Sequence, residues 1–259
     1  MKKLIKSILF EVVRSKLLLI FYPLLFALMI LLGLINAPES TVSGMYISDS
    51  SLFYTFPLAA VAAIVGIVIC PDYRDKVGNY EILSGHSRIS VYLSRVLCAI
   101  IPAAFLAYIL TFLPLVSGTI VAEWGEKLVF SDVLARQLLF IFPFLRLAAF
   151  SACLAFVIKN EYVMLATGFV ISFGSLFITS LFEEVSSSVF ISVYNLNYLM
   201  SFDTWSIYNL SPTKGIVKYS SATGAIDPKM IVATITVSSA MTLIYILIGY
   251  ALFRRSEMN

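Results

Sequence analysis

The chain has 259 residues, of which 60% are hydrophobic and only 13% charged, and its mean hydropathy is +0.94. Soluble domains carry about 25% charged residues, so this chain has too few charges to cover the surface of a soluble fold of its size. The composition therefore excludes a soluble domain and indicates an integral membrane protein. The net charge of +3 gives no indication of nucleic-acid binding, and no nucleic-acid partner is expected.

The first predicted element is an amphipathic helix over residues 1–16. Its apolar residues recur at helical spacing and form a stripe along one side of the helix: Leu4, Ile5, Ile8, Leu9, Val12 and Val13. Most of its charged residues lie off this stripe. A helix of this kind is typical of the inner membrane surface, where it lies in the plane of the bilayer. The alternative is a cytosolic extension of the first membrane span with a solvated polar side.

Six long uncharged runs follow, the fourth of them interrupted only by Arg146. Each has the roughly 20 residues that a helix needs to cross the hydrocarbon core. We therefore predict an all-α, polytopic membrane protein forming a single transmembrane domain over residues 1–259. Its spans are 17–35, 51–70, 96–122, 137–158, 162–182 and 230–253.

The basic residues predict the orientation of these spans. Twelve lysines and arginines fall on the side of the N-terminus and only four on the opposite side. Because cytoplasmic loops are enriched in Lys and Arg, both termini are expected in the cytoplasm, with the chain in a bacterial plasma membrane.

Only two loops are long enough to hold structure of their own. The external loop 183–229 contains an uncharged stretch, 185–202, whose serines and asparagines favour a re-entrant helix over a seventh span. It carries an aromatic stripe that fits either the outer mouth of a pathway or plain packing against the bundle: Phe190, Tyr194, Tyr198 and Phe202.

The other long loop is the cytoplasmic segment 71–95. Pro71 is expected to end the second span, and Gly85 to break the chain before a third helix that begins near Ser90. Between them a short amphipathic helix is predicted, with one apolar face made of Tyr73, Val77, Tyr80 and Leu83. Such a helix needs either the groove of a soluble domain or the membrane interface, and periodicity leaves both open.

Several kinds of chemistry are missing from the sequence. There is no G-x-x-x-x-G-K-[S/T] nucleotide-binding loop, and a single histidine, His86, cannot build a two-histidine metal site. No Asp or Glu lies inside the six runs, although ion-coupled transporters usually hold carboxylates there. An enzyme is not expected, and a secondary transporter is disfavoured.

Here the sequence resembles a family. The amphipathic N-terminal helix, two spans and the loop string from Tyr80 to Arg88, YEILSGHSR, before the third span look like the permease subunits of type-2 ABC exporters. Within that family the chain looks most like small Gram-positive permeases that export amphipathic, antimicrobial or toxin peptides.

The resemblance implies a half-transporter without catalytic residues. Two permease copies would pair, because six helices enclose little space alone, and two cytosolic ATPase subunits would dock on loop 71–95, the coupling helix. The ATPase is expected as a separate chain, because this one ends at Asn259, six residues past the last predicted span. No cofactor is expected on this chain; ATP and Mg would be bound by the ATPase. The rival is a stand-alone membrane immunity or scaffold protein.

The residues expected to couple the permease to the ATPase lie in that loop. Tyr73, Val77 and Tyr80 would fill the ATPase groove, and Glu81 would meet a basic residue at its rim. Gly85 would permit the turn into the third span, and Leu83 and Arg88 complete the set.

Arg146 is the one charge predicted near the middle of a span. A guanidinium there costs about 2.5–3.5 kcal/mol and cannot lose its proton, so it should face protein or water. Its expected partners are Glu183 or Glu184, helix carbonyls, or water. Two readings stay open: Arg146 pins the re-entrant segment to the bundle, or it attracts substrate carboxylates in an apolar pathway at the dimer interface.

Overall fold

The computed structural model describes residues 2–37, 41–74, 77–126, 129–184 and 228–256, and throughout these residues the regular structure is helical. The predicted all-α fold class is confirmed for this part of the chain. In chain order the helices are α1 (Lys2–Arg14), α2 (Lys16–Asn36), α3 (Val42–Arg74), α4 (Val77–Leu83), α5 (Arg88–Val121), α6 (Phe130–Leu139), α7 (Ile141–Ile158), α8 (Glu161–Glu184) and α11 (Pro228–Ser256).

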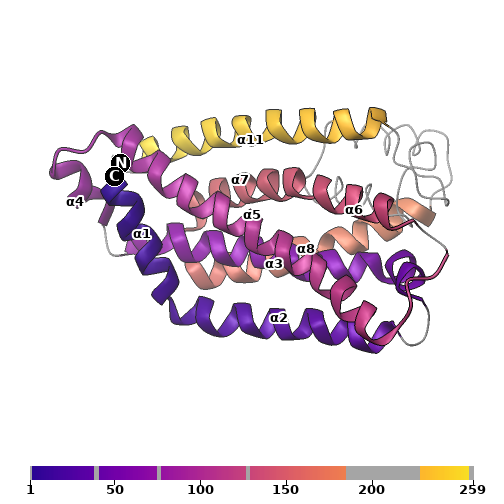
Figure 1. The fold of residues 1–259 in the computed structure, drawn as a ribbon. Coiled ribbons are helices and arrows are strands. Elements are labelled where there is room, and N and C mark those ends of the chain that lie inside the picture. The colour runs from indigo at the N-terminus through magenta and orange to yellow at the C-terminus, as the bar shows by residue number, and fades with distance from the viewer. Residues whose placement is uncertain (1, 38–40, 75–76, 127–128, 185–227, 257–259) are drawn as a thin grey trace.

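The long helices form one elongated bundle, with α1 and α4 at one end of it (Figure 1). Helix α3 packs against α5, α7 and α8, while α2 packs mainly against α5, and α11 mainly against α7. The start of α1 and the end of α11 lie at the same end as α4, which we call the α4 end (Figure 1).

Within the part of the chain that the structure describes, four segments are long and apolar enough to cross a membrane by length and composition: Leu18–Asn36, Arg88–Val121, Val133–Ile158 and Thr234–Arg255. The other two predicted spans, 51–70 and 162–182, fall in α3 and α8, whose described residues include the shorter apolar stretches Thr55–Pro71 and Glu161–Gly174. The four long apolar helices mark the chain as a membrane protein.

Small residues let the central helices approach closely. A Cβ added to Gly168 of α8 would lie 2.6 Å from the Cβ of Ala62 on α3, and one added to Gly66 of α3 would lie 2.9 Å from the Met164 side chain of α8. Because helices in lipid associate through such close packing, the alanine-rich middle of α3 forms the centre of the core.

The predicted N-terminal helix is present as α1, and Ser15 separates it from α2. Its apolar stripe is divided between two environments: Leu4, Ile8 and Val12 are buried against the bundle, whereas Leu9 and Val13 are exposed. The helix is therefore held by protein contacts along part of the stripe that was expected to face lipid.

One predicted boundary is wrong. Helix α3 continues through Pro71 to Arg74, because one proline removes a single hydrogen bond and the last turn still forms around it. The fourth predicted span, 137–158, falls within the candidate span Val133–Ile158, which Phe140 divides into α6 and α7. At this level the Thr111 hydroxyl of α5 lies 3.0 Å from the side-chain Oε1 of Gln137 on α6, within hydrogen-bond distance.

Candidate functional site

The connection from α4 to α5 is a tight, well-defined turn. The amides of Ser84 and Gly85 donate to the carbonyls of Tyr80 and Ile82, at 2.9 and 3.0 Å. Gly85 has a φ of +97°, a conformation that favours glycine, and an added Cβ would meet nothing within 4 Å. Helix α5 then begins with the Ser87 hydroxyl accepting a hydrogen bond from the Ser90 amide. The turn therefore fixes the direction of α4 relative to α5.

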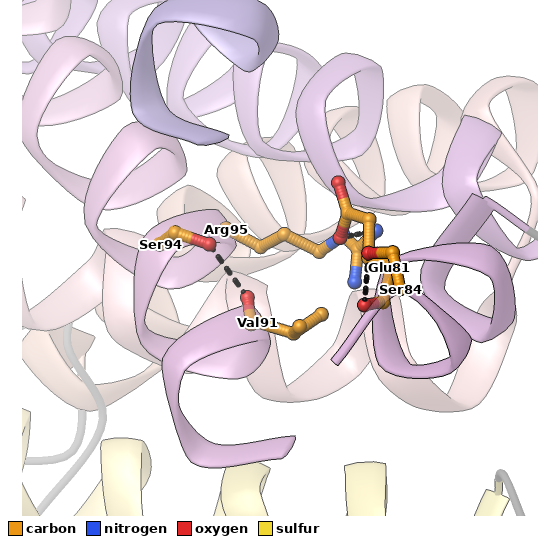
Figure 2. Close-up of polar contacts among 5 residues, drawn as sticks. All are labelled: Glu81, Ser84, Val91, Ser94 and Arg95. Atoms are coloured by element: carbon orange, nitrogen blue, oxygen red, sulfur yellow. Dashed lines mark hydrogen bonds and ion pairs between the residues drawn. The ribbon is translucent and has the colours of Figure 1, made fainter. Parts of the chain in front are cut away.

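An ion pair fastens the two helices together. The Nη2 atom of Arg95 on α5 donates to Oε2 of Glu81 on α4 at 2.8 Å, and the two side chains point toward one another across the helices (Figure 2). The Arg95 side chain is only 2% exposed and that of Glu81 17%. Because a charge-assisted hydrogen bond in a largely buried place is stronger than one in water, this pair restrains α4.

The exposed side of α4 is apolar. Tyr80 is 69% exposed and Leu83 is 83% exposed, while Ile82 packs against the core of the bundle. Helix α4 thus turns Ile82 and Glu81 inward and offers an aromatic and an aliphatic side chain outward, at one end of the molecule. Arg88 and His86 are exposed beside it.

The structure separates one residue from the predicted apolar face. Tyr73 belongs to the last turn of α3, which ends at Arg74, so it does not continue the helix that carries Tyr80. Val77 is the first residue of α4. The side chains of Tyr73 and Val77 lie outside the described ones, so their predicted contacts with a partner stay predictions.

A small cavity lies at the junction of α3 with the turn between α7 and α8. Its volume is about 170 Å³, and it is lined by Cys70, Pro71, Lys159, Asn160, Glu161 and Tyr162. Lys159 ends α7 with a φ of +57°, and the side-chain oxygen of Asn160 caps α8 by accepting the amides of Tyr162 and Val163. This second turn adds a polar surface to the bundle.

Two further arginines are completely buried. Arg146 of α7 and Arg136 of α6 both have 0% exposure. The hydrogen bond between Cys153 and Tyr245 joins α7 to the neighbouring α11. Arg146 lies two turns before Cys153 on α7, and the buried Ser238 lies two turns before Tyr245 on α11, which runs parallel to α7. Arg146 and Ser238 are therefore at the same level of the bundle. Arg146 therefore lies inside the protein rather than on its outer surface.

The expected surroundings of Arg146 fall largely beyond the described side chains. Glu183 and Glu184 are the last residues of α8, but their side chains are not among the described ones. Almost all of the predicted re-entrant segment 183–229 lies outside the described residues. The same is true of its aromatic stripe, which is made of Phe190, Tyr194, Tyr198 and Phe202.

Sequence reasoning missed the burial of Arg95 and its pairing with Glu81. A signal was present, because Val91, Arg95 and Cys98 follow one another at i, i+4 and i+7 on α5, which places a charge in an apolar stripe. A charge at such a position needs an opposite charge nearby, and Glu81 is the acidic residue just before the turn. The structure thus gives Glu81 a partner within the chain.

Among the described residues, no group of three or more His, Cys, Asp or Glu side chains is arranged to hold a metal ion. Comparisons of the chain with protein-family models, curated proteins and solved structures return no match.

Proposed function

We propose that this chain is the membrane-spanning permease subunit of an ATP-driven ABC exporter, driven by ATPase subunits that are separate chains. The observation that carries the proposal is α4: a short helix with Tyr80 and Leu83 exposed, fastened to the long helix α5 through Glu81 and Arg95. The exposed apolar face gives a docking partner a surface to bind. Because α4 is fastened to α5, a partner that moves α4 would also move this span.

The geometry of α4 supports a protein groove as its partner. Tyrosine is among the residues that carry most of the energy of protein interfaces, because its ring buries a large area at a small cost in conformational entropy. The face of α4 that carries Tyr80 and Leu83 points away from the bundle, and the ion pair lies on the inner side. A groove could thus enclose Tyr80 without breaking the attachment of α4.

The complete topology in this proposal has six spans, with α3 and α8 adding to the four long apolar helices. Both termini and α4 face the cytoplasm of a bacterial cell, in keeping with the excess of basic residues on that side. Helix α1 lies at the inner membrane surface, with its exposed Leu9 and Val13 toward lipid. The segment 183–229 forms the external re-entrant part.

Two copies of the chain would enclose the transport pathway, which is mainly apolar and suits amphipathic, antimicrobial or toxin peptides. ATP and Mg are bound by the ATPase subunits, and closure of those subunits pushes α4 and shifts the bundle between inward-open and outward-open states. In this mechanism the permease performs no chemical step.

The experiment is a co-purification of the tagged permease from its native host, in which a co-purifying P-loop ATPase is identified by mass spectrometry. Tyr80→Ala is expected to weaken ATPase binding about thirtyfold, the effect of removing an interface anchor worth about 2 kcal/mol. Phe130→Ala removes an aromatic side chain that is 59% exposed at the other end of the bundle, and it should leave binding unchanged.

Failure of the wild-type chain to retain an ATPase, together with transport or protection insensitive to vanadate, would refute the exporter and favour a stand-alone immunity or scaffold protein. Transport that needs a proton gradient in vesicles without ATP would favour a secondary transporter.

A further inference from the structure

Two side-chain hydrogen bonds join helix α11 to the bundle within the short segment 245–249. The Tyr92 hydroxyl of α5 donates to the Ile246 carbonyl at 2.5 Å, and the Cys153 thiol of α7 donates to the Tyr245 carbonyl at 2.7 Å. These two adjacent carbonyls of α11 therefore receive side-chain donors from two different helices. Since a carbonyl oxygen has two lone pairs, it can accept such a donor and still serve its own helix.

Gly249 makes this approach possible. A Cβ at position 249 would lie 2.7 Å from the Tyr92 hydroxyl oxygen and 3.4 Å from the Cys153 sulfur. Any larger residue there would push Tyr92 away from the Ile246 carbonyl. The absence of a side chain is thus a requirement of the contact between α5 and α11.

The ring of Tyr92 strengthens the same junction. It packs against Phe156 of α7 and against Tyr250 and Phe253 of α11, with ring centroids 5.3–5.5 Å apart. Tyr92 itself is only 2% exposed. Other side chains of α11 are exposed, with Leu243 at 64% and Leu247 at 69%.

Tyr92 lies one turn before Arg95 on the same face of α5, because the two residues are three positions apart. Arg95 holds α4 through Glu81, and Tyr92 holds α11 through Ile246. The first two turns of α5 therefore join the exposed helix at the α4 end to the last long helix of the bundle.

We propose that Tyr92 is a positioning residue of the transport cycle, which passes the displacement of α4 and α5 to α11 through its hydrogen bond to the Ile246 carbonyl. This inference rests on the proposed exporter function. In this inference a movement of α5 displaces α11, and the two helices meet where Tyr92 lies against Gly249.

The test compares Tyr92→Phe, Gly249→Ala and the double variant with Tyr250→Phe as the matched control. Tyr92→Phe keeps the ring and removes only the hydroxyl. Tyr250→Phe removes a hydroxyl from the same aromatic cluster, and among the described residues that hydroxyl makes no hydrogen bond. The first measurement is amide hydrogen exchange of the full chain in lipid nanodiscs. Tyr92→Phe should speed exchange of the segment around 246–250 about fivefold, the effect of losing one neutral hydrogen bond.

The second measurement is the number of ATP molecules hydrolysed per substrate exported by the complete transporter. Tyr92→Phe and Gly249→Ala should raise this ratio several-fold without changing ATPase binding, and Tyr250→Phe should leave it at the wild-type value. The double variant should be no worse than Tyr92→Phe, because phenylalanine lacks the oxygen that the new Cβ would meet.

Faster exchange with an unchanged ratio would show that Tyr92 is merely structural and would overturn the proposal, as would unchanged exchange in Tyr92→Phe. If the wild-type chain binds no ATPase, the exporter function fails and the transport role of Tyr92 fails with it. The exchange measurement, which needs no ATPase, then still decides whether Tyr92 fastens α11.

Discussion

Neutralising Glu81 is expected to destabilise the α4 end of the bundle. In Glu81→Gln the Arg95 guanidinium, 2% exposed, loses the carboxylate that lies 2.8 Å away, and it cannot respond by losing its proton. Removing one partner of a fully buried pair costs about 3–5 kcal/mol. Because Glu81 is 17% exposed, water can reach part of its place, so we expect a smaller loss in the free energy of unfolding, about 2 kcal/mol.

The measurement is thermal unfolding of the full chain in lipid nanodiscs. For a chain of about this size, a loss of 2 kcal/mol corresponds to a fall in Tm of about 4–8 °C. The double variant Glu81→Leu with Arg95→Met should recover most of this loss, because replacing both charges by apolar side chains leaves neither of them buried alone. Glu126→Gln, at an exposed acid on the α5–α6 connection, should melt like the wild type.

An unchanged Tm in Glu81→Gln would show that the ion pair does not hold α4. A double variant that is less stable than either single variant would equally contradict the reasoning, since it would mean that the two side chains act through other contacts.

The close packing of α2 on α5 makes Gly33→Ala destabilising, because its Cβ would clash with the Ser117 hydroxyl oxygen and the Pro114 carbonyl and would lie 2.8 Å from the Pro114 Cα. We expect a loss of about 1–3 kcal/mol in thermal unfolding, whereas Gly174→Ala, with nothing within 4 Å, should be neutral; equal melting of the two variants would contradict this. Arg146→Leu should lower Tm if Arg146 pins the segment after α8, or abolish export of acidic peptides at normal Tm if it contacts substrate. Normal stability together with normal export would exclude both roles.

The positions of the helices could be predicted from the sequence because lipid demands long apolar runs. The first predicted span, 17–35, corresponds to α2, and the last, 230–253, lies within α11. The expected helix end at Pro71 was wrong, because α3 continues past it to Arg74. The division of the segment Val133–Ile158 at Phe140 was not predicted, since neither hydropathy nor charge marks it. In a bilayer such details depend on which neighbouring helix supplies contacts, and a run of apolar letters does not carry that information.

The candidate site also combines features that the sequence predicted with features that it did not. Gly85 could be recognised as a turn residue from its type alone, and it has the positive φ that only glycine adopts readily. Tyr73 was placed on the wrong helix, since helical spacing continued smoothly across the end of α3. The Glu81–Arg95 pair joins residues 14 positions apart, and the charge of Arg95 in an apolar stripe was a local signal for it. The Tyr92–Ile246 bond joins residues 154 positions apart and follows from the packing of helices rather than from any local pattern.

The location of both chain ends has a practical consequence for testing the proposed pairing of two copies. Since α1 begins and α11 ends at the α4 end of the bundle, two copies can be joined in tandem by a linker that stays at that end (Figure 1). A substitution such as Tyr80→Ala can then be placed in one half only, which would show, for the proposed exporter, whether a single intact α4 is enough to drive two paired copies. The same location argues against bulky fusion partners at either end, because they would crowd the surface around Tyr80 and Leu83; a reporter in the connection between α5 and α6 would avoid it.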